Sequence, residues 1–402
     1  MSDKGGNFLN IIEEAKNISS KIIEDRRELH KIPETGMILP KTAQYVINRL
    51  EKLNIDFKTY DSHSGICAVI GKKEGKTIAV RGDMDALPVK EETNLEFKSE
   101  NGNMHACGHD AHTAILLGLA ELLKNHEHEL NGKVKLIFQP CEECGPGGAM
   151  AMIEDNVLEN PKVDAMLALH TDNAIRDYEN GDVIVRYGSM SAYEDPINLK
   201  IVGKGGHAST PHVCIDPISI ATLIINNIQY ILTREIDQTI PTLISFTSIQ
   251  GGRGSNNIIP DVVEVKGTLR STDSKVREYV LDRIVEIVDG LTKIMKAKYE
   301  INFLGGCSGV VNNRDMVDKF ITSAEKIIGK KSIHVLNDYN MGAEDAGFFF
   351  EKVPGCYFLL YNPLPFDDGV IYPAHNSKFM MDDSVLYKGA ALFMQTVIDY
   401  LG

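Results

Sequence analysis

Hydrophobic residues recur along this chain with two different periods, and the two alternate. Stretches with apolar residues three and four positions apart indicate amphipathic helices, whereas short continuous apolar runs indicate buried strands. The predicted helices cover residues 8–30, 42–53 and 113–123, and the predicted strands cover 77–81, 133–138 and 163–169. Because strands and helices alternate, the pattern predicts an α/β domain with a mostly parallel sheet.

The rhythm changes near Tyr187, where strands begin to follow one another directly. From there the pattern predicts strands at 196–202, 243–249 and 258–268 and helices at 216–231 and 273–294. We expect this stretch to be an inserted α+β domain, residues 188–300, within a discontinuous domain made of residues 1–187 and 301–402. Near the C-terminus, a strand at 355–361 and a closing helix at 384–401 complete the predicted elements.

Composition and net charge indicate which binding partners and which cellular compartment the sequence favours. The chain has 402 residues and a formal net charge of −14, which disfavours binding to nucleic acid or to anionic membranes. The odd number of cysteines, 7, favours a reducing compartment over a secreted disulfide scaffold. The N-terminus has no leader pattern, and no stretch has the length of apolar residues needed to span a bilayer. We therefore expect a cytoplasmic protein.

Polar residues gather where the predicted strands end, which is where open α/β sheets bind their ligands. The densest group is M-H-A-C-G-H-D-A-H at 104–112, in which three of the chain's 12 histidines lie close together. Thiolate and imidazole are common ligands of zinc-like metals, so Cys107 and His109 are candidate ligands. The competing interpretation is an incidental histidine-rich loop in which Asp110 caps the following helix.

A second group, Q-P-C-E-E-C-G-P-G-G at 139–148, follows the next strand. One of the adjacent carboxylates of Glu142 and Glu143 could bind a metal while the other takes a proton from a water. One alternative is a solvated acidic turn. Another is a thiol redox motif, because Cys141 and Cys144 have the C-x-x-C spacing.

Several further groups are weak when each is taken separately. His170 ends the strand at 163–169, and the carboxylates of Asp83 and Asp85 end the strand at 77–81, where they could orient a metal-bound imidazole. In the predicted insertion, His207 lies in a glycine-rich loop and could donate a hydrogen bond to an oxyanion. Residues 251–260, with Arg270 after them, offer amides and a guanidinium to a carboxylate.

Taken in order, the motifs resemble one family, the amidohydrolase branch of the aminoacylase/carboxypeptidase metallopeptidases, which includes hippurate hydrolases, N-acyl-amino-acid deacylases and plant auxin-conjugate hydrolases. The resemblance covers nearly the whole chain. The motifs that carry it are R-G-D-M-D-A-L-P (81–88), M-H-A-C-G-H-D-A-H (104–112), Q-P-x-E-E (139–143), A-L-H (168–170), G-K-G-G-H-A-S-T-P-H (203–212), N-N-I-I-P-D (256–261), M-G-A-E-D (341–345) and P-A-H-N (373–376).

The resemblance implies a site with two divalent metal ions and a glutamate base. The implied ligands are Cys107 as the bridge, His109 and His170 on one ion, and Glu143 and His375 on the other, with Glu142 as the general base. Asp83, Asp85 and Asp110 would support these ligands without binding metal. A bridging thiolate favours zinc, but the resemblance also admits manganese, cobalt or nickel.

The resemblance also gives the predicted insertion a role as a lid that mediates homo-oligomerisation. His207 would stabilise the oxyanion, and Asn257 and Arg270 would approach the carboxylate of the substrate, an N-acyl amino acid or short peptide. The implied reaction is metal-dependent hydrolysis of the amide bond of an N-acyl amino acid.

The sequence departs from the family pattern at two places. Cys141 and Cys144 replace the usual small residues around the glutamate pair, and residues 171–178 differ from a stretch associated with the acyl pocket. The same site could serve a carboxypeptidase or dipeptidase. A more distant alternative is a non-catalytic metal-binding protein or a C-x-x-C redox protein.

Overall fold

The computed structural model describes residues 10–402 except 146, 175 and 253. Residues 8 and 9, the predicted start of the first helix, and the N-terminal stretch that was expected to lack a leader lie outside the described part. The chain divides into two compact units. The first unit lies within residues 1–190, 311–337 and 348–402, and the second comprises Ser191–Val310 and Asp338–Gly347.

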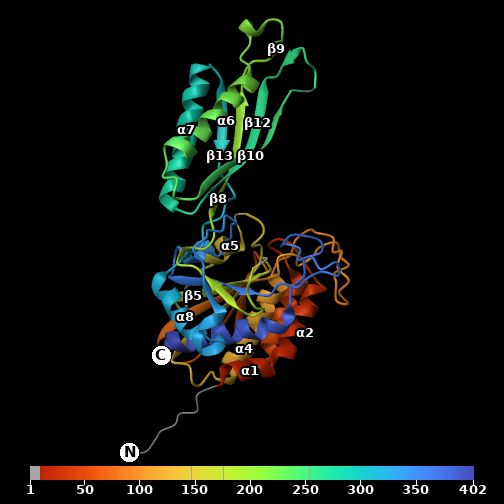
Figure 1. Cartoon of the computed structure of the whole chain (residues 1–402), viewed down its shortest axis with the longest axis vertical. Coiled ribbons are helices and arrows are strands. Elements are labelled where there is room, and N and C mark those ends of the chain that lie inside the picture. Colours follow the sequence, from red (N-terminus) through yellow and green to blue (C-terminus); the bar gives the residue numbers. More distant parts are fainter. Residues whose placement is uncertain (1–9, 146, 175, 253) are drawn as a thin grey trace, which may run out of the picture. The chain divides into compact units, whose positions relative to one another are not determined.

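The first unit is built on a large sheet with the strand order β1-β2-β4-β3-β5-β16-β6-β15 (Figure 1). These strands are β1 (Phe57–Thr59), β2 (Ile66–Ile70), β3 (Lys76–Asp83), β4 (Gly132–Gln139), β5 (Ala165–Asp172), β6 (Val183–Val185), β15 (Ile333–Val335) and β16 (Gly355–Tyr361). The central strands β4, β3, β5 and β16 run parallel, which confirms the predicted fold class. The antiparallel pairs β1–β2, β2–β4 and β16–β6 were not predicted.

Helices cover the sheet of the first unit on both faces. The larger hydrophobic core lies between the sheet and the helices α2, α4, α8 and α10, and a smaller core lies under α5 and α9. The helices are α1 (Ile11–Asn17), α2 (Ser19–His30), α3 (Pro40–Lys52), α4 (His109–Asn125), α5 (Gly148–Glu154), α8 (Arg314–Ile328), α9 (Gly347–Phe350) and α10 (Leu386–Leu401). Two short strands, β7 (Gly188–Ser189) and β14 (Val311–Asn312), pair separately.

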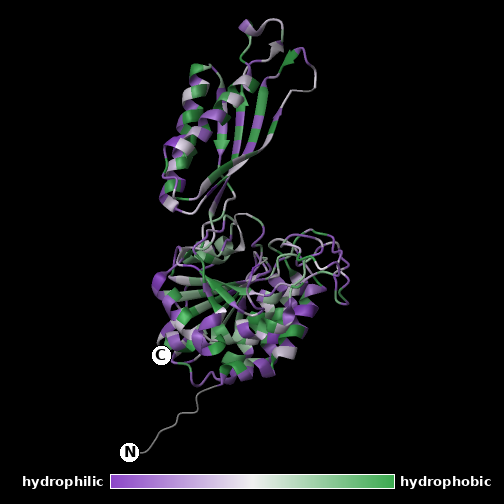
Figure 2. Ribbon diagram, in the orientation of Figure 1, coloured by the Kyte–Doolittle hydropathy of each residue, from purple (hydrophilic) through white to green (hydrophobic). Residues whose placement is uncertain are grey.

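The second unit is an antiparallel sheet, in the order β10-β12-β8-β13, covered by two helices that lie side by side (Figure 1). Its elements are β8 (Tyr193–Val202), β9 (Gly206–His207), α6 (Pro217–Arg234), β10 (Thr242–Gly251), β11 (Ile258–Ile259), β12 (Val262–Ser271), α7 (Ser274–Ile294) and β13 (Lys298–Asn302). Hydrophobic residues run along both helices (Figure 2) and pack with β8 and β12 into a core of their own. This α+β unit overlaps the insertion expected at 188–300.

One predicted helix is divided in the structure. The apolar pattern of residues 8–30 continues without interruption, yet α1 ends at Asn17 and α2 begins at Ser19. Ile18 between them has φ −100° and ψ 6°, which departs from helical geometry. Because the buried positions keep their spacing on both sides of Ile18, periodicity could not reveal the break.

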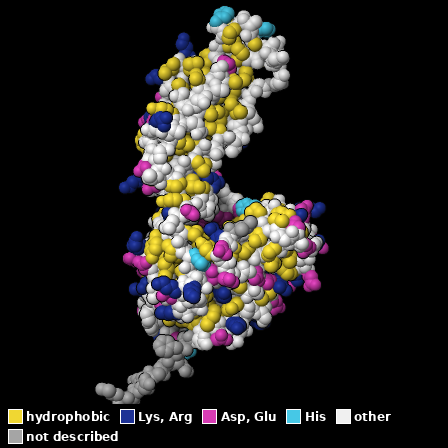
Figure 3. Space-filling model, viewed as in Figure 1, with side chains coloured by type: hydrophobic (Ala, Val, Ile, Leu, Met, Phe, Trp, Pro, Cys, Tyr) yellow, Lys and Arg dark blue, Asp and Glu magenta, His cyan; other side chains and the backbone are white. Residues whose placement is uncertain are grey.

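The surface charges and the hydropathy of the helices relate to the expectation that the protein binds neither nucleic acid nor membranes. On the face of the first unit visible in Figure 3, acidic and basic side chains are interspersed. Among the described residues, no helix combines the length and the hydropathy needed to cross a membrane.

Gly148, the first residue of α5, has no room for a side chain. A Cβ built there would lie 1.7 Å from the carbonyl oxygen of Pro140 and 2.8 Å from its carbonyl carbon. Since both atoms are backbone, Gly148→Ala should force the 140–148 loop to move and destabilise the first unit by about 2 kcal/mol. We expect calorimetry to show a melting temperature lower by about 4 °C or more.

Gly290 provides the matched control, because it lies in α7 and a Cβ built there meets no atom within 4 Å. Gly290→Ala should leave stability unchanged or raise it slightly, since alanine favours helix over glycine by about 1 kcal/mol. A Gly148→Ala variant that melts at the wild-type temperature would contradict the described path of the loop.

Candidate metal centre

The register of the parallel strands brings the predicted clusters to one edge of the sheet. Asp83 at the end of β3 lies beside Gln139 at the end of β4, and Arg81 lies beside Ala168 of β5. The loop that follows β4 carries the glutamate pair, and β5 carries His170. Groups widely separated in the sequence therefore converge at the carboxyl ends of adjacent strands.

Cys107, His109 and His170 form the first candidate ligand group. Their donor atoms all lie within 4.8 Å of one another. The Nδ1 atom of His170 donates to the carbonyl oxygen of Thr171 at 2.6 Å, and its Nε2 atom lies 3.3 Å from Cys107 Sγ. Because the proton is on Nδ1, the lone pair of Nε2 is available to a metal ion.

Cys107 also belongs to a second group, with Glu143 and His375. His375 Nε2 lies 3.0 Å from Glu143 Oε1. The backbone N–H of His375 donates to the carbonyl of Ala106 at 2.7 Å, so the C-terminal segment is fixed beside Cys107. One thiol is thus shared by two sets of donors.

The surroundings of His109 provide a test of whether a cation fits. Both ring nitrogens are buried, and the nearest carboxylate oxygens of Asp85 and Asp83 lie 3.4 and 3.6 Å away, longer than normal hydrogen bonds. Burial acts to lower the pKa of His109, but the charge of Asp83 together with the contacts of Cys107 and Asp85 holds the pKa well above its ordinary value. A site that favours a positive charge on this ring suits a metal ion in place of the proton.

The protonation of the other donors is also compatible with metal binding. Burial lowers the pKa of His170 to about 4, which keeps the ring in its neutral, ligating form at pH 7. Burial raises the pKa of the Cys107 thiol to about 12. Since a cation stabilises the thiolate, ion binding at Cys107 should release a proton. The mixed thiolate, imidazole and carboxylate set fits a divalent transition metal.

Asp83 is buried among charged and polar partners. Its carboxylate accepts from Arg81 Nη1 at 2.9 Å and lies 2.6 Å from His112 Nδ1. The backbone N–H of Thr171 donates to His112 Nε2 at 2.9 Å, so the His112 proton is on Nδ1 and faces Asp83. Sequence reasoning gave Arg81 and Thr171 no role, although Arg81 shares a strand face with Asp83 two residues away, which indicates an ion pair.

Asp85 fixes the backbone of the glutamate pair. One carboxylate oxygen accepts the N–H of Glu142 at 2.9 Å, and the other accepts the N–H of Glu143 at 3.1 Å. Glu142 Oε2 lies 3.9 Å from His109 Nε2. Asp85 therefore positions the loop as well as lying near an imidazole.

Asp110, the second residue of α4, is paired with side chains of α2. Its carboxylate lies 2.9 Å from Arg26 Nε and 2.7 Å from His30 Nδ1, both on α2. Burial acts to raise the pKa of Asp110, but the charge of Arg26 and the contacts with His30 together leave the pKa below its usual range. This pair ties the first turn of α4, where His109 lies, to α2.

Cys141 and Cys144 are joined by a disulfide bond. The bridge spans the glutamate pair, so Glu142 and Glu143 lie within a small covalent ring. Both cysteines were expected as thiols near the metal site; the structure places the sulfur atoms in a bond with each other.

The three candidates in the insertion lie in the second unit. His207 on β9 pairs with Ile258 on β11, and the adjacent Ala208 N–H donates to the carbonyl of Asn257 at 2.9 Å. Arg270 on β12 donates to the carbonyl of Met341 at 2.8 Å. His207 and Asn257 therefore lie on neighbouring segments, whereas Arg270 is engaged elsewhere in the unit. Arg253, in the predicted carboxylate-binding stretch, lies outside the described residues.

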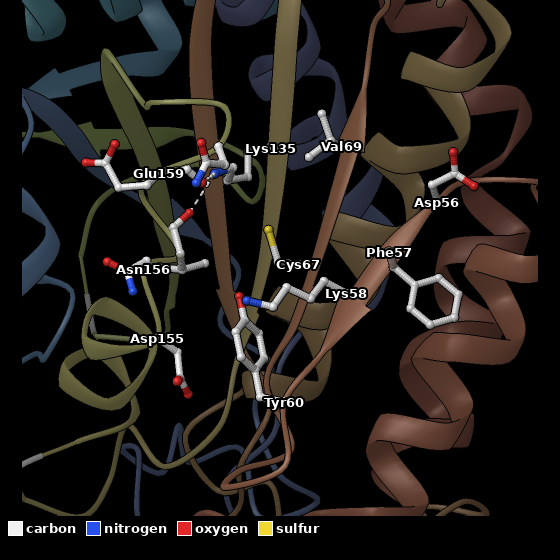
Figure 4. Close-up of a pocket in the computed structure, with 12 residues that line it drawn as sticks. Asp56, Phe57, Lys58, Tyr60, Cys67, Val69, Lys135, Asp155, Asn156 and Glu159 are labelled. Atoms are coloured by element: carbon white, nitrogen blue, oxygen red, sulfur yellow. Dashed lines mark hydrogen bonds between the residues drawn. The ribbon is translucent and has the colours of Figure 1, made fainter.

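A separate pocket of about 600 Å³ lies beside β1, β2 and β4 in the first unit (Figure 4). Lys135 reaches into this region, but its Nζ donates to the carbonyls of Val157, Glu159 and Pro161 at 2.7–2.8 Å. The amine therefore holds the segment after α5 in place and is not available as an anion-binding group.

Comparison with known proteins identifies the family. The model of peptidase family M20/M25/M40 matches residues 79–399, a span that includes every candidate ligand. The chain belongs to this family. It is a metal-dependent hydrolase of amide bonds, which confirms the family and the class of reaction expected from the motifs.

Relatives of this M20 chain cover most of its length. Thermostable carboxypeptidase 1 of Saccharolobus solfataricus is 41% identical over 95% of this chain and 97% of its own. The N-acyl-L-amino acid amidohydrolase of Geobacillus stearothermophilus is 37% identical over 73% of this chain and 79% of its own. The crystal structure of the Bacillus subtilis YXEP protein, a dinuclear metal binding peptidase, has a TM-score of 0.79 at 30% identity, covering 96% of this chain and 99% of that one.

The two hydrogen bonds to Asp85 should matter for turnover. In Asp85→Asn the side chain keeps one acceptor oxygen and presents an N–H₂ group to the other amide, so one of the two bonds is lost. We expect kcat/KM for amide hydrolysis or metal affinity to fall by about 10- to 100-fold. Steady-state kinetics and metal titration of the purified variant would measure this.

Asp155→Asn is the control, because Asp155 bonds to Ser62 and His63 and belongs to none of the ligand groups. It should retain wild-type kinetics. If Asp85→Asn is equally active, the carboxylate does not position the glutamate pair.

Proposed function

We propose that the protein hydrolyses the amide bond of N-acyl amino acids with two divalent metal ions. The observation that carries this proposal is the sharing of Cys107 by two donor groups next to the glutamate pair. The residues proposed to hold the ions are Cys107, His109, Glu143, His170 and His375. The named activity of the Geobacillus relative supports the substrate class.

Glu142 is proposed as the general base. Its side chain is mostly buried, and its carboxylate lies 3.9 Å from His109 Nε2, beside the proposed ligands. The ions supply Lewis acidity when bound. The carboxylate would take a proton from the attacking water and deliver it to the leaving nitrogen. Asp83, Asp85 and Asp110 would hold the ligands and the base in place.

Residues of the second unit are proposed to complete substrate binding. His207 would donate to the oxyanion, and Asn257 and Arg270 would approach the substrate carboxylate. The contacts of Arg270 with Met341 and, at 3.5 Å, with Glu194 make its guanidinium the least available of the three. We further propose that this unit forms a lid and a homo-oligomer contact, and that the protein is cytoplasmic.

The second candidate function is a carboxypeptidase or dipeptidase. The 41% identity to a thermostable carboxypeptidase favours it specifically.

The metal is proposed to be zinc because of the thiolate, with manganese, cobalt and nickel as alternatives. Reconstitution of the stripped protein with each ion separately, followed by activity assays, would identify the most effective one.

Glu142→Gln should separate metal binding from catalysis. The amide keeps the size of the side chain but cannot take a proton, so we expect kcat to fall by about 10²- to 10⁴-fold with unchanged metal content. Kinetics with elemental analysis would measure both. Glu154→Gln, an exposed glutamate at the end of α5, is the control and should be fully active. Retained turnover in Glu142→Gln would rule out the assignment of the base.

Two substrates with the same C-terminal residue would separate the two functions. N-acetylmethionine and alanylmethionine differ only in the acyl group on the carbonyl side of the cleaved bond, which is acetyl in one and alanyl in the other. We expect a kcat/KM at least about tenfold higher for the acetyl compound, equivalent to roughly 1.4 kcal/mol. The reverse preference would favour the dipeptidase.

A further inference from the structure

The loop Cys141-Glu142-Glu143-Cys144 combines a disulfide with the proposed base and a proposed ligand. It follows β4 and precedes α5. Cys141 has φ +55°, in the left-handed region that residues other than glycine rarely adopt. The cross-link between Cys141 and Cys144 limits the backbone conformations open to the two glutamates between them.

Hydrogen bonds from two other parts of the chain, Asp85 and Gly148, also restrain this loop. Asp85 accepts the N–H groups of Glu142 and Glu143, and the carbonyl of Cys141 accepts the N–H of Gly148 at 2.9 Å. Of these tethers, the disulfide is the one that a thiol reductant can open. Once it is open, hydrogen bonds alone restrain the loop, and a rotation of the Cys141 backbone would move the two glutamates that follow it.

The two sulfur-bearing residues differ in accessibility. Cys141 is 4% exposed, whereas Cys144 is only partly buried. An incoming thiolate would therefore reach the sulfur of Cys144 first, since access decides which sulfur is attacked.

We propose that the Cys141–Cys144 bridge is a reversible redox clamp that holds Glu142 and Glu143 in their catalytic positions. The clamp rests on the proposed function for its effect on turnover. The oxidised chain has the glutamates in place and is active; the reduced chain turns over more slowly. In the cytoplasm, where we propose the protein acts, disulfides are mostly transient and used for sensing.

The opening step is a thiol–disulfide exchange with a dithiol reductant. Its thiolate attacks Cys144 Sγ, the S–S bond breaks, and Cys141 leaves as a thiolate that takes up a proton. The second thiol of the reductant then attacks the mixed disulfide and releases Cys144 as a thiol. The chain gains two electrons and two protons, and the reductant becomes a cyclic disulfide. A small-molecule disulfide reverses the exchange.

The test uses dithiothreitol on the purified full chain, followed by its removal and resupply of metal. Alkylation of the denatured protein should modify five cysteines before reduction and seven after it. With metal resupplied in excess, reduction should lower kcat about tenfold or more with little change in KM, and a small-molecule disulfide should restore it. A reduced protein with unchanged kcat would overturn the proposal.

Variants distinguish the clamp from other thiol effects. Cys141→Ala with Cys144→Ala should have the low kcat of reduced wild type in both buffers, while Cys214→Ala, which keeps the bridge, should respond as wild type does. Full activity in the double variant would overturn the clamp, because the loss in wild type would then come from freed thiols binding metal. A redox response in the double variant would also overturn it.

Hydrogen exchange decides the question independently of turnover and of whether the double variant folds. Reduction of wild type should speed exchange of the Glu142 and Glu143 amides by about tenfold or more, because Asp85 alone would then protect them. Unchanged exchange overturns the clamp. If neither redox form hydrolyses an N-acyl amino acid or a dipeptide, the proposed function fails, and the exchange result still decides whether the bridge holds the loop.

Discussion

Two buried carboxylates at the end of β3 hold the candidate metal centre together. Asp83 is paired with Arg81 and faces His112, and Asp85 accepts both amides of the glutamate pair. A buried carboxylate is tolerated only when charges and hydrogen bonds satisfy it. The start of α4, the loop after β4 and the end of β5 all contact β3 or the two residues that follow it. These contacts therefore fix the positions of the three segments.

Much of this arrangement follows from the sequence. The apolar runs predict the central strands, and the polar residues after them predict a site at their carboxyl ends. The role of His375 came only from the motif resemblance, because nothing local to residues 373–376 relates them to Cys107. Nor could the sequence indicate that Asp110 pairs with Arg26 and His30, which lie about 80 residues away and meet it only through the packing of α2 on α4.

Local sequence patterns also failed to predict features of the backbone that depend on tertiary contacts. The break at Ile18 leaves the apolar spacing intact, and the antiparallel strands β1 and β2 extend a sheet whose parallel core was predicted. The C-x-x-C spacing indicates a possible redox motif, but only the folded structure shows that the sulfur atoms are bonded across the two glutamates. Each of these features depends on partners that a local pattern does not contain.

The division into two units has a consequence for how such a protein can diversify. All the proposed ion ligands lie in the first unit, whereas His207, Asn257 and Arg270 lie in the second, which has a hydrophobic core of its own. Under the proposed roles, substitutions at these three positions would change substrate binding and leave the ion ligands of the first unit unaltered. The proposed ion ligands and the proposed substrate contacts thus lie in two units that each have a hydrophobic core of their own.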